Sequence, residues 1–119
     1  MMSLDRIDVV DAMGVDRESG AAILNLIDSW SWEEEHEQAH LAALVDKFNR
    51  YLGFVESGEI YQAYPAAEGR SLEILITGRF EPSAAGLRFM AHASEVAASY
   101  DVKLKFQHRP WEPDREISD

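Results

Sequence analysis

Residues 32–57, WEEEHEQAHLAALVDKFNRYLGFVES, form the longest segment of the chain with helical periodicity. Its apolar residues recur every three or four positions, as in an amphipathic helix, and they are Leu41, Leu44, Val45, Phe48, Tyr51, Leu52 and Val55. Ser31 and Glu34 have the spacing of a capping box before the helix, and Gly58 stands where a C-terminal cap would end it. The segment predicts one uninterrupted helix around which the rest of the fold is arranged.

Strand-like segments flank this helix on both sides. Residues 7–15 and 21–29 predict two strands joined by a turn that contains Asp16 and Gly20. Residues 70–80 and 102–108 alternate apolar and polar side chains and predict two more strands. Between these, Pro82 and Ser83 open a second long helix, and residues 59–64 predict a short helical turn closed by Pro65.

The predicted order is therefore strand, strand, helix, strand, helix, strand. This β-β-α-β-α-β order predicts an α+β two-layer sandwich, in which one four-stranded mixed sheet carries two helices on one face. A right-handed crossover makes the last two strands parallel. We expect a single domain over residues 1–108 and a polar, proline-bearing C-terminal tail over residues 109–119.

Composition limits the classes of function. The chain has no cysteine, which excludes disulfides and thiolate metal sites, and its N-terminal residues do not resemble a signal peptide. No segment is apolar enough to span a membrane, so we expect a cytoplasmic protein. The formal charge of −11 argues against binding to nucleic acid or to anionic membranes. It suits a soluble surface, or a basic protein partner such as a nuclease that must be blocked.

His36, Glu37 and His40 match the H-E-x-x-H pattern of zinc metallopeptidases. A catalytic zinc ion needs a third protein ligand, and in one common arrangement it would stand at Asp46, after a glycine that breaks the helix. Here Ala43 replaces that glycine, so the helix continues and Asp46 points about 100° away from the two histidines. We therefore interpret the match as part of a glutamate-rich first helical turn, although His36 and His40 could bind a metal ion adventitiously.

Aromatic residues mark the candidate interaction sites. Asp28, Trp30 and Trp32 lie where the second strand leads into the long helix, as either an aromatic-lined pocket or a packed helix start. Tyr61 and Tyr64 form a small aromatic patch, which more often covers the edge of a core. Trp111 lies in the tail, and an exposed indole there suggests docking within the chain or across a dimer.

A resemblance to a known family covers nearly all of the chain apart from the tail. It rests on residues in the second strand, the long helix and the segments that follow, which are Leu24, Leu26, Asp28, Trp32, His40, Leu41, Leu44, Lys47, Asn49, Tyr51, Leu52, Phe54, Ser57, Gly58, Tyr61, Tyr64, Pro65, Gly69, Arg70, Pro82, Ser83, Gly86 and Leu87. On these residues the chain resembles an uncharacterised family of small bacterial proteins, catalogued only as a domain of unknown function. The resemblance implies no activity and requires neither His36 nor Glu37. It does imply that Asp28, Trp32 and His40 form a local unit.

These observations lead to a ranked set of expectations about function. The chain has no glycine-rich dinucleotide motif, no phosphate-binding loop and no G-x-S-x-G motif, so we expect no cofactor and no catalysis. We expect a domain that binds another protein or associates with itself as a homodimer, through Asp28, Trp30, Trp32, His40, Tyr61, Tyr64 and Trp111. One alternative is an immunity or inhibitor protein that neutralises a basic toxin. A second alternative is a zinc hydrolase that uses the H-E-x-x-H match.

Overall fold

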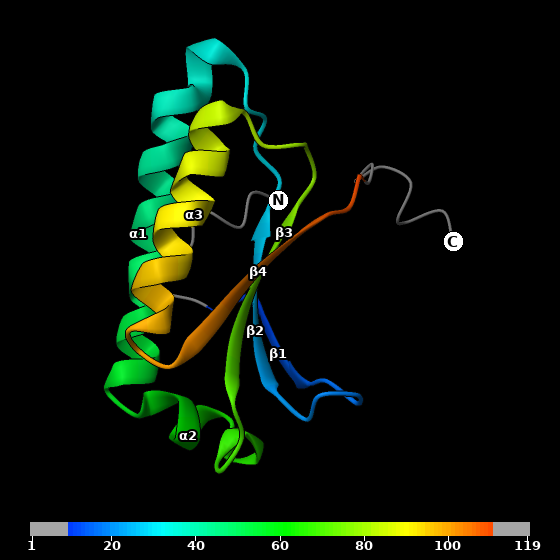
Figure 1. Ribbon diagram of the computed structural model, residues 1–119, viewed down its shortest axis with the longest axis vertical. Coiled ribbons are helices and arrows are strands. Elements are labelled where there is room, and N and C mark those ends of the chain that lie inside the picture. The colour runs from blue at the N-terminus through cyan, green and yellow to red at the C-terminus, as the bar shows by residue number, and fades with distance from the viewer. Residues whose placement is uncertain (1–9, 111–119) are drawn as a thin grey trace.

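A computed structural model of the protein describes residues 10–110. Its elements follow one another as β1 (Ala12–Val15), β2 (Ala22–Asp28), a 3-10 turn (Glu34–His36), α1 (Glu37–Glu56), α2 (Glu59–Ala63), a second 3-10 turn (Pro65–Ala67), β3 (Leu72–Gly78), α3 (Ala84–Ala98) and β4 (Val102–His108). The four strands form one sheet, and α1 and α3 lie side by side over one of its faces (Figure 1). The predicted α+β class and element order are confirmed.

The sheet has the strand order β1-β2-β3-β4. β1 runs antiparallel to β2, while β2, β3 and β4 are parallel neighbours, so the sheet is mixed. The prediction that the last two strands are parallel is confirmed, and they are also adjacent. Because each parallel connection carries a helix back across the same face, one face of the sheet is covered by α1 and α3 (Figure 1).

The hydrophobic core lies between the sheet and these helices. Alternate residues of each central strand point into it, which is why the strands read as alternating sequences. The fully buried apolar side chains come from every layer and include Leu24, Leu26, Leu44, Ile60, Ile74 and Ile76. Leu52 and Phe48 of α1 close the same core, so the apolar stripe seen in residues 32–57 is the face that packs on the sheet.

Both ends of the long helix test a prediction. The C-terminal prediction is confirmed, since Gly58 adopts the left-handed conformation with φ 83° directly after α1. The predicted capping box at Ser31 and Glu34 is wrong: the chain forms the 3-10 turn first, and neither this turn nor α1 has a side-chain cap. The physical reason is that the backbone carbonyl of Ser31 bonds to His40, which holds the segment extended until Glu34.

Two further differences concern the termini. The first strand begins at Ala12 within the described residues, because Val10 and Asp11 lie outside the ladder with β2. After β4 the ladder continues for one bond, in which the Arg109 N–H donates to the Gly78 carbonyl at 2.8 Å. Trp111, a predicted docking residue, lies outside the described residues. Among the helices of residues 10–110, none has the length and apolarity needed to span a bilayer.

Candidate functional site

The candidate site lies at the carboxyl ends of β2 and β3. Asp28 and Gly78 are the last residues of these strands and are register partners. The chain leaves both strands here toward the starts of α1 and α3, so two loops and two helix N-termini meet at one edge of the sheet (Figure 1). Ligands of open α/β sheets commonly bind outside the carboxyl ends of the strands.

A buried imidazole and carboxylate lie beneath this edge. His40 is fully buried and Asp28 is 2% exposed, and His40 Nε2 lies 2.6 Å from Asp28 Oδ2. The Nδ1 atom of His40 lies 2.9 Å from the Ser31 carbonyl oxygen. A carbonyl only accepts hydrogen bonds, so Nδ1 carries a proton, and the short contact to Asp28 needs a second proton between the two groups. Both ring nitrogens are therefore in use.

Two indoles enclose the same pair. Trp32 stacks on the His40 ring with centroids 3.7 Å apart and an interplanar angle of 28°, and Trp30 lies 5.7 Å away in a tilted arrangement. Asp28 also accepts a hydrogen bond from the Trp30 backbone N–H through Oδ1, at 3.1 Å. The structure thus brings Asp28, Trp32 and His40 into contact. They form a sealed support for the turn and do not reach solvent.

Glu37 has a different role from the one that the H-E-x-x-H pattern suggests. Its Oε2 accepts a hydrogen bond from the Ser83 hydroxyl at 2.5 Å, and Ser83 is the N-cap of α3, where its Oγ accepts from the Gly86 N–H. Glu37 therefore joins the first turn of α1 to the first turn of α3. This explains why a carboxylate lies close to the apolar stripe of the long helix.

The two histidines of the motif do not share a site. The side chain of His36 is 63% exposed, while His40 is buried with both nitrogens bonded to the protein. Among the described residues, Glu33, Glu35 and His36 could bring ligand atoms within 4.8 Å of one another. All three side chains are exposed, and such acidic surface groups are common without a metal ion.

A surface hollow of about 430 Å³ opens above the buried pair. It is lined by Ser29, Trp30, Ser31, His36, Ala39, Arg79 and Phe80. Phe80 is 38% exposed, and the Arg79 guanidinium lies over its ring, 5.2 Å from the centroid. The Trp30 Nε1 atom is buried and has no hydrogen-bond acceptor within the part of the chain that the structure describes.

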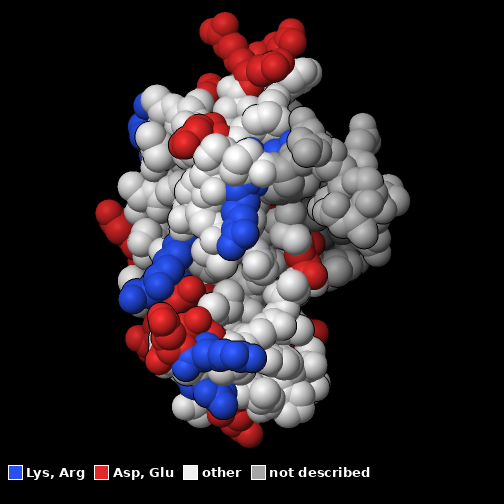
Figure 2. Space-filling model, turned by 90° about the vertical axis from the view of Figure 1, so that its right-hand side faces the viewer, with Lys and Arg blue, Asp and Glu red and all other residues white. Residues whose placement is uncertain are grey.

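An acidic turn borders the hollow. Glu33, Glu34 and Glu35 are exposed directly before His36, which is one of the lining residues, and His36 Nε2 lies 3.6 Å from Glu35 Oε1. Figure 2 shows a group of acidic side chains projecting at the end of the molecule where the helical segment begins. The arrangement offers aromatic walls beside negative charge, which suits an aliphatic chain that ends in a cation.

The remaining predicted residues lie elsewhere. Tyr61 is in α2 and Tyr64 follows it, at the opposite end of α1 from the hollow (Figure 1). Both are half-buried and pack against the hydrophobic core, which agrees with an aromatic cover for the core edge. The structure does not bring them together with Asp28, Trp30, Trp32 and His40.

Sequence reasoning missed one buried polar network. Lys47 of α1 is fully buried, and its Nζ donates to both Asp11 carboxylate oxygens at 2.7 and 2.9 Å. Asp11 also accepts from the Ile27 N–H at 2.8 Å, which satisfies a strand donor beyond the end of β1. Tyr51 donates to the Asn25 carbonyl at 2.7 Å, and burial raises the pKa of its phenol. The spacing of His40, Lys47 and Tyr51 places all three on the buried face of one helix, and this was the available signal.

Comparison with known proteins gives one result of substance. No curated protein and no solved structure matches the chain. A family model described as a family of unknown function, DUF6572, matches residues 2–110, which is most of the sequence. The residues that pack the core and those that build the buried pair lie within this match. The chain therefore belongs to the DUF6572 family of unknown function.

Proposed function

We propose that this protein is a non-catalytic protein-binding domain whose hollow at the carboxyl ends of β2 and β3 receives a basic side chain of a partner protein. The observation that carries the proposal is the union of aromatic walls and an acidic border in one hollow of about 430 Å³. Hollows of roughly 300–1,000 Å³ are typical of sites that enclose a small group. This one has room for a single arginine or lysine side chain with its neighbours.

The chemistry of the walls favours a long cationic side chain. The methylene groups of lysine or arginine can pack on Trp30 and Phe80, while the charged end reaches Glu35 on the border. A cation placed over an aromatic ring gains about 0.5–2 kcal/mol, more as water is excluded. The net charge of −11 adds long-range attraction that speeds the approach of a basic partner.

The buried pair supports a positioning role below the hollow. Because His40 and Asp28 are sealed from solvent, a substrate placed in the hollow would not touch either group. Their contacts instead hold Trp30 and Trp32, through the Trp30 N–H bond to Asp28 and the stacking of Trp32 on His40. A rigid wall loses little conformational entropy on binding, which favours recognition of another protein.

An immunity or inhibitor protein is one specific form of this proposal. A basic nuclease offers the arginines and lysines that the acidic turn would attract, and the exposed Glu33, Glu34 and Glu35 favour this alternative. A zinc hydrolase would require His40 to leave the core and give up the bonds to Asp28 and Ser31, so we do not favour it. We place the protein in the cytoplasm on the strength of its cysteine-free composition.

Selection from a random peptide display library tests the proposal. We expect the enriched peptides to contain arginine or lysine beside an apolar residue. Their affinity should fall at least about tenfold for Phe80→Ala and for Glu35→Lys, which corresponds to about 1.4 kcal/mol or more. Leu87→Ala is the matched control, because Leu87 is 57% exposed on α3 and lies outside the hollow. Enriched peptides without basic residues, or equal binding by the Phe80→Ala protein, would remove the proposal.

A further inference from the structure

One face of the sheet has no helix over it. α1 and α3 cover the other face, and within residues 10–110 no helix crosses to this side (Figure 1). Three of the four strands are parallel neighbours, and parallel sheets occur almost only where both faces are covered. Ile23, Ile27 and Leu75 project from this face, which makes its centre partly apolar. The uncovered face therefore calls for an occupant.

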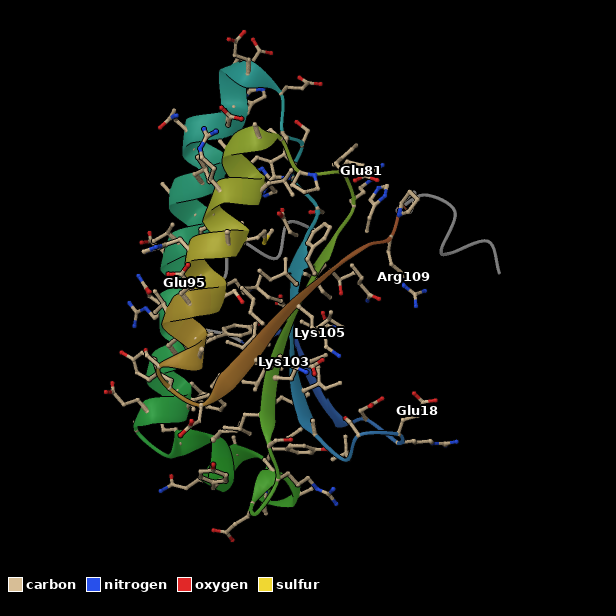
Figure 3. All side chains as sticks on the ribbon, in the orientation of Figure 1. Glu18, Glu81, Glu95, Lys103, Lys105 and Arg109 are labelled. Carbon is tan, nitrogen blue, oxygen red and sulfur yellow. The ribbon has the colours of Figure 1, made fainter. Side chains whose placement is uncertain are left out.

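The two edges of this face differ in size and charge. At β1 the side chains are those of Ala12 and Gly14, and a surface hollow of about 480 Å³ lies over them. At β4 the face carries Lys103 and Lys105, which Figure 3 shows extending away from the helices. One edge is thus shallow and the other carries long cationic side chains.

The centre of the face is a closed polar ladder. Thr77 Oγ1 donates to Asn25 Oδ1 at 2.9 Å, and Gln107 Nε2 donates to Thr77 Oγ1 at 3.0 Å. These side chains come from three neighbouring strands and satisfy one another. They can be covered at a smaller desolvation cost than unpaired polar groups would incur.

The charges of this face nearly balance, although the whole chain carries −11. Its bases and acids are Arg17, Lys103 and Lys105 against Asp16, Glu18 and Glu73. Lys105 Nζ lies 3.5 Å from Glu73 Oε1, so part of this balance is already internal. Two copies of an acidic protein repel each other least where the local charge is close to zero.

We propose that a second copy of this chain covers the uncovered face, with the two-fold axis parallel to the strands. Register pairs Gly14 with Ile23, Ile23 with Glu73, and Glu73 with Lys103, so these residues lie at one height in the sheet. Rotation about an axis along the strands keeps this height and exchanges the edges. Lys103 of each copy then lies over Gly14 of the other, and Lys105 lies over Ala12.

Charge selects this arrangement over the other two-fold. An axis across the strands would place β4 on β4 and bring lysines against lysines, and opposed like charges are destabilising. With the axis along the strands, each lysine enters the shallow hollow that Asp16 borders on the other copy. The long side chains fill the space that the small residues leave, and opposite charges meet at both edges.

The size of the face predicts a weak, reversible dimer. Four strands of up to seven residues cover about 19 Å by about 23 Å, or ~440 Å² of flat area. A stable interface buries about 800 Å² of accessible surface on each partner, and the pleated face reaches this only in part. We therefore expect a dissociation constant in the micromolar range, about 1–100 μM.

Gly14 offers a clean test of the interface. A Cβ added there meets no atom within 4 Å, and its φ is not in the left-handed region, so Gly14→Arg leaves the fold intact. Sedimentation velocity should show at least tenfold weaker dimerisation for Gly14→Arg than for wild type. Gly53→Arg is the matched control, because Gly53 lies exposed on α1 with equally open space around it.

Engineered cysteines test the axis, since the chain contains none of its own. A mixture of Gly14→Cys and Lys103→Cys proteins should form the mixed disulfide between the two variants on mild oxidation. A predominance of Lys103→Cys homodimers would overturn the proposed axis. Monomer at all concentrations, or a dimer that Gly14→Arg does not weaken, would overturn the interface.

Two further outcomes separate other occupants of the face. A chain that dimerises only after removal of residues 111–119 would assign the face to that terminal segment and contradict the proposal. The Phe80→Ala variant should dimerise as wild type does, because Phe80 lies at the carboxyl-end hollow. Failure of the dimer and failure of the peptide-binding hollow are therefore distinguishable.

Discussion

Replacing His40 by leucine should destabilise the protein far more than replacing Asp28 by asparagine. His40→Leu leaves the Asp28 carboxylate 2% exposed and holding only the hydrogen bond from the Trp30 N–H. It also removes the donor to the Ser31 carbonyl and the ring that stacks on Trp32. Removing one partner of a buried ion pair costs about 3–5 kcal/mol, out of a total stability of about 5–15 kcal/mol.

Asp28→Asn keeps the number of hydrogen bonds. The amide oxygen can still accept from the Trp30 N–H, and the amide nitrogen can donate to Nε2 of a neutral His40. Since only the charge assistance of one bond is lost, we expect a cost of about 1 kcal/mol. Urea unfolding followed by circular dichroism measures both free energies, and equal m-values would show that the unfolded states are comparable.

The double variant provides the decisive control. Asp28→Asn added to His40→Leu removes the uncompensated charge, so the double variant should be more stable than His40→Leu alone by about 2 kcal/mol. The reasoning is refuted if His40→Leu costs less than about 1 kcal/mol, or if the second substitution lowers stability further. Either result would mean that the pair is not held as an imidazolium and a carboxylate in the folded protein.

Three more predictions concern other contacts. Gly86→Ala should cost about 1–3 kcal/mol in urea unfolding, because an added Cβ would lie 3.0 Å from the Trp32 ring; Gly53→Ala, in open space on α1, should instead stabilise by up to about 1 kcal/mol. Lys47→Met should cost about 3–5 kcal/mol, because its bonded carboxylate partner stays close to the core; a change below about 1 kcal/mol would show that water replaces the amine. Burial raises the pKa of the Tyr51 phenol above its ordinary value of 10.0, so its contribution to stability is complete below pH 10 and is lost as the pH rises further. Ultraviolet titration should find one tyrosine of the four that ionises only with unfolding, and Tyr51→Phe should remove it.

Much of the fold follows from local patterns. Alternation in residues 70–80 and 102–108, helical spacing in residues 32–57 and the proline-serine start of α3 each report a local preference, and each element formed near its predicted bounds. The exception is instructive. Ser31 and Glu34 have the spacing of a cap, yet the helix starts later, because the carbonyl of Ser31 is bonded by a histidine on the next turns. A tertiary contact outweighed the local signal.

The site was predictable only in part. Asp28, Trp30, Trp32 and His40 could be named from their place at a strand end and from the family resemblance, since chain position alone puts them near one another. Which of them reach solvent could not be read from the sequence. His36 and His40 stand one helical turn apart, but one is exposed and the other is sealed under two indoles, because burial depends on where the sheet and α3 lie.

By itself the sequence determined the class of the fold, the order of its elements and the interior face of the long helix. These depend on side-chain periodicity and on glycine and proline, which act over a few residues. Only the tertiary structure decided that Lys47 meets Asp11, that Glu37 bonds to Ser83, and that Arg79 and Phe80 complete a hollow with Trp30. Each of these contacts joins residues from different elements, and its formation depends on how the sheet and helices pack rather than on any local preference.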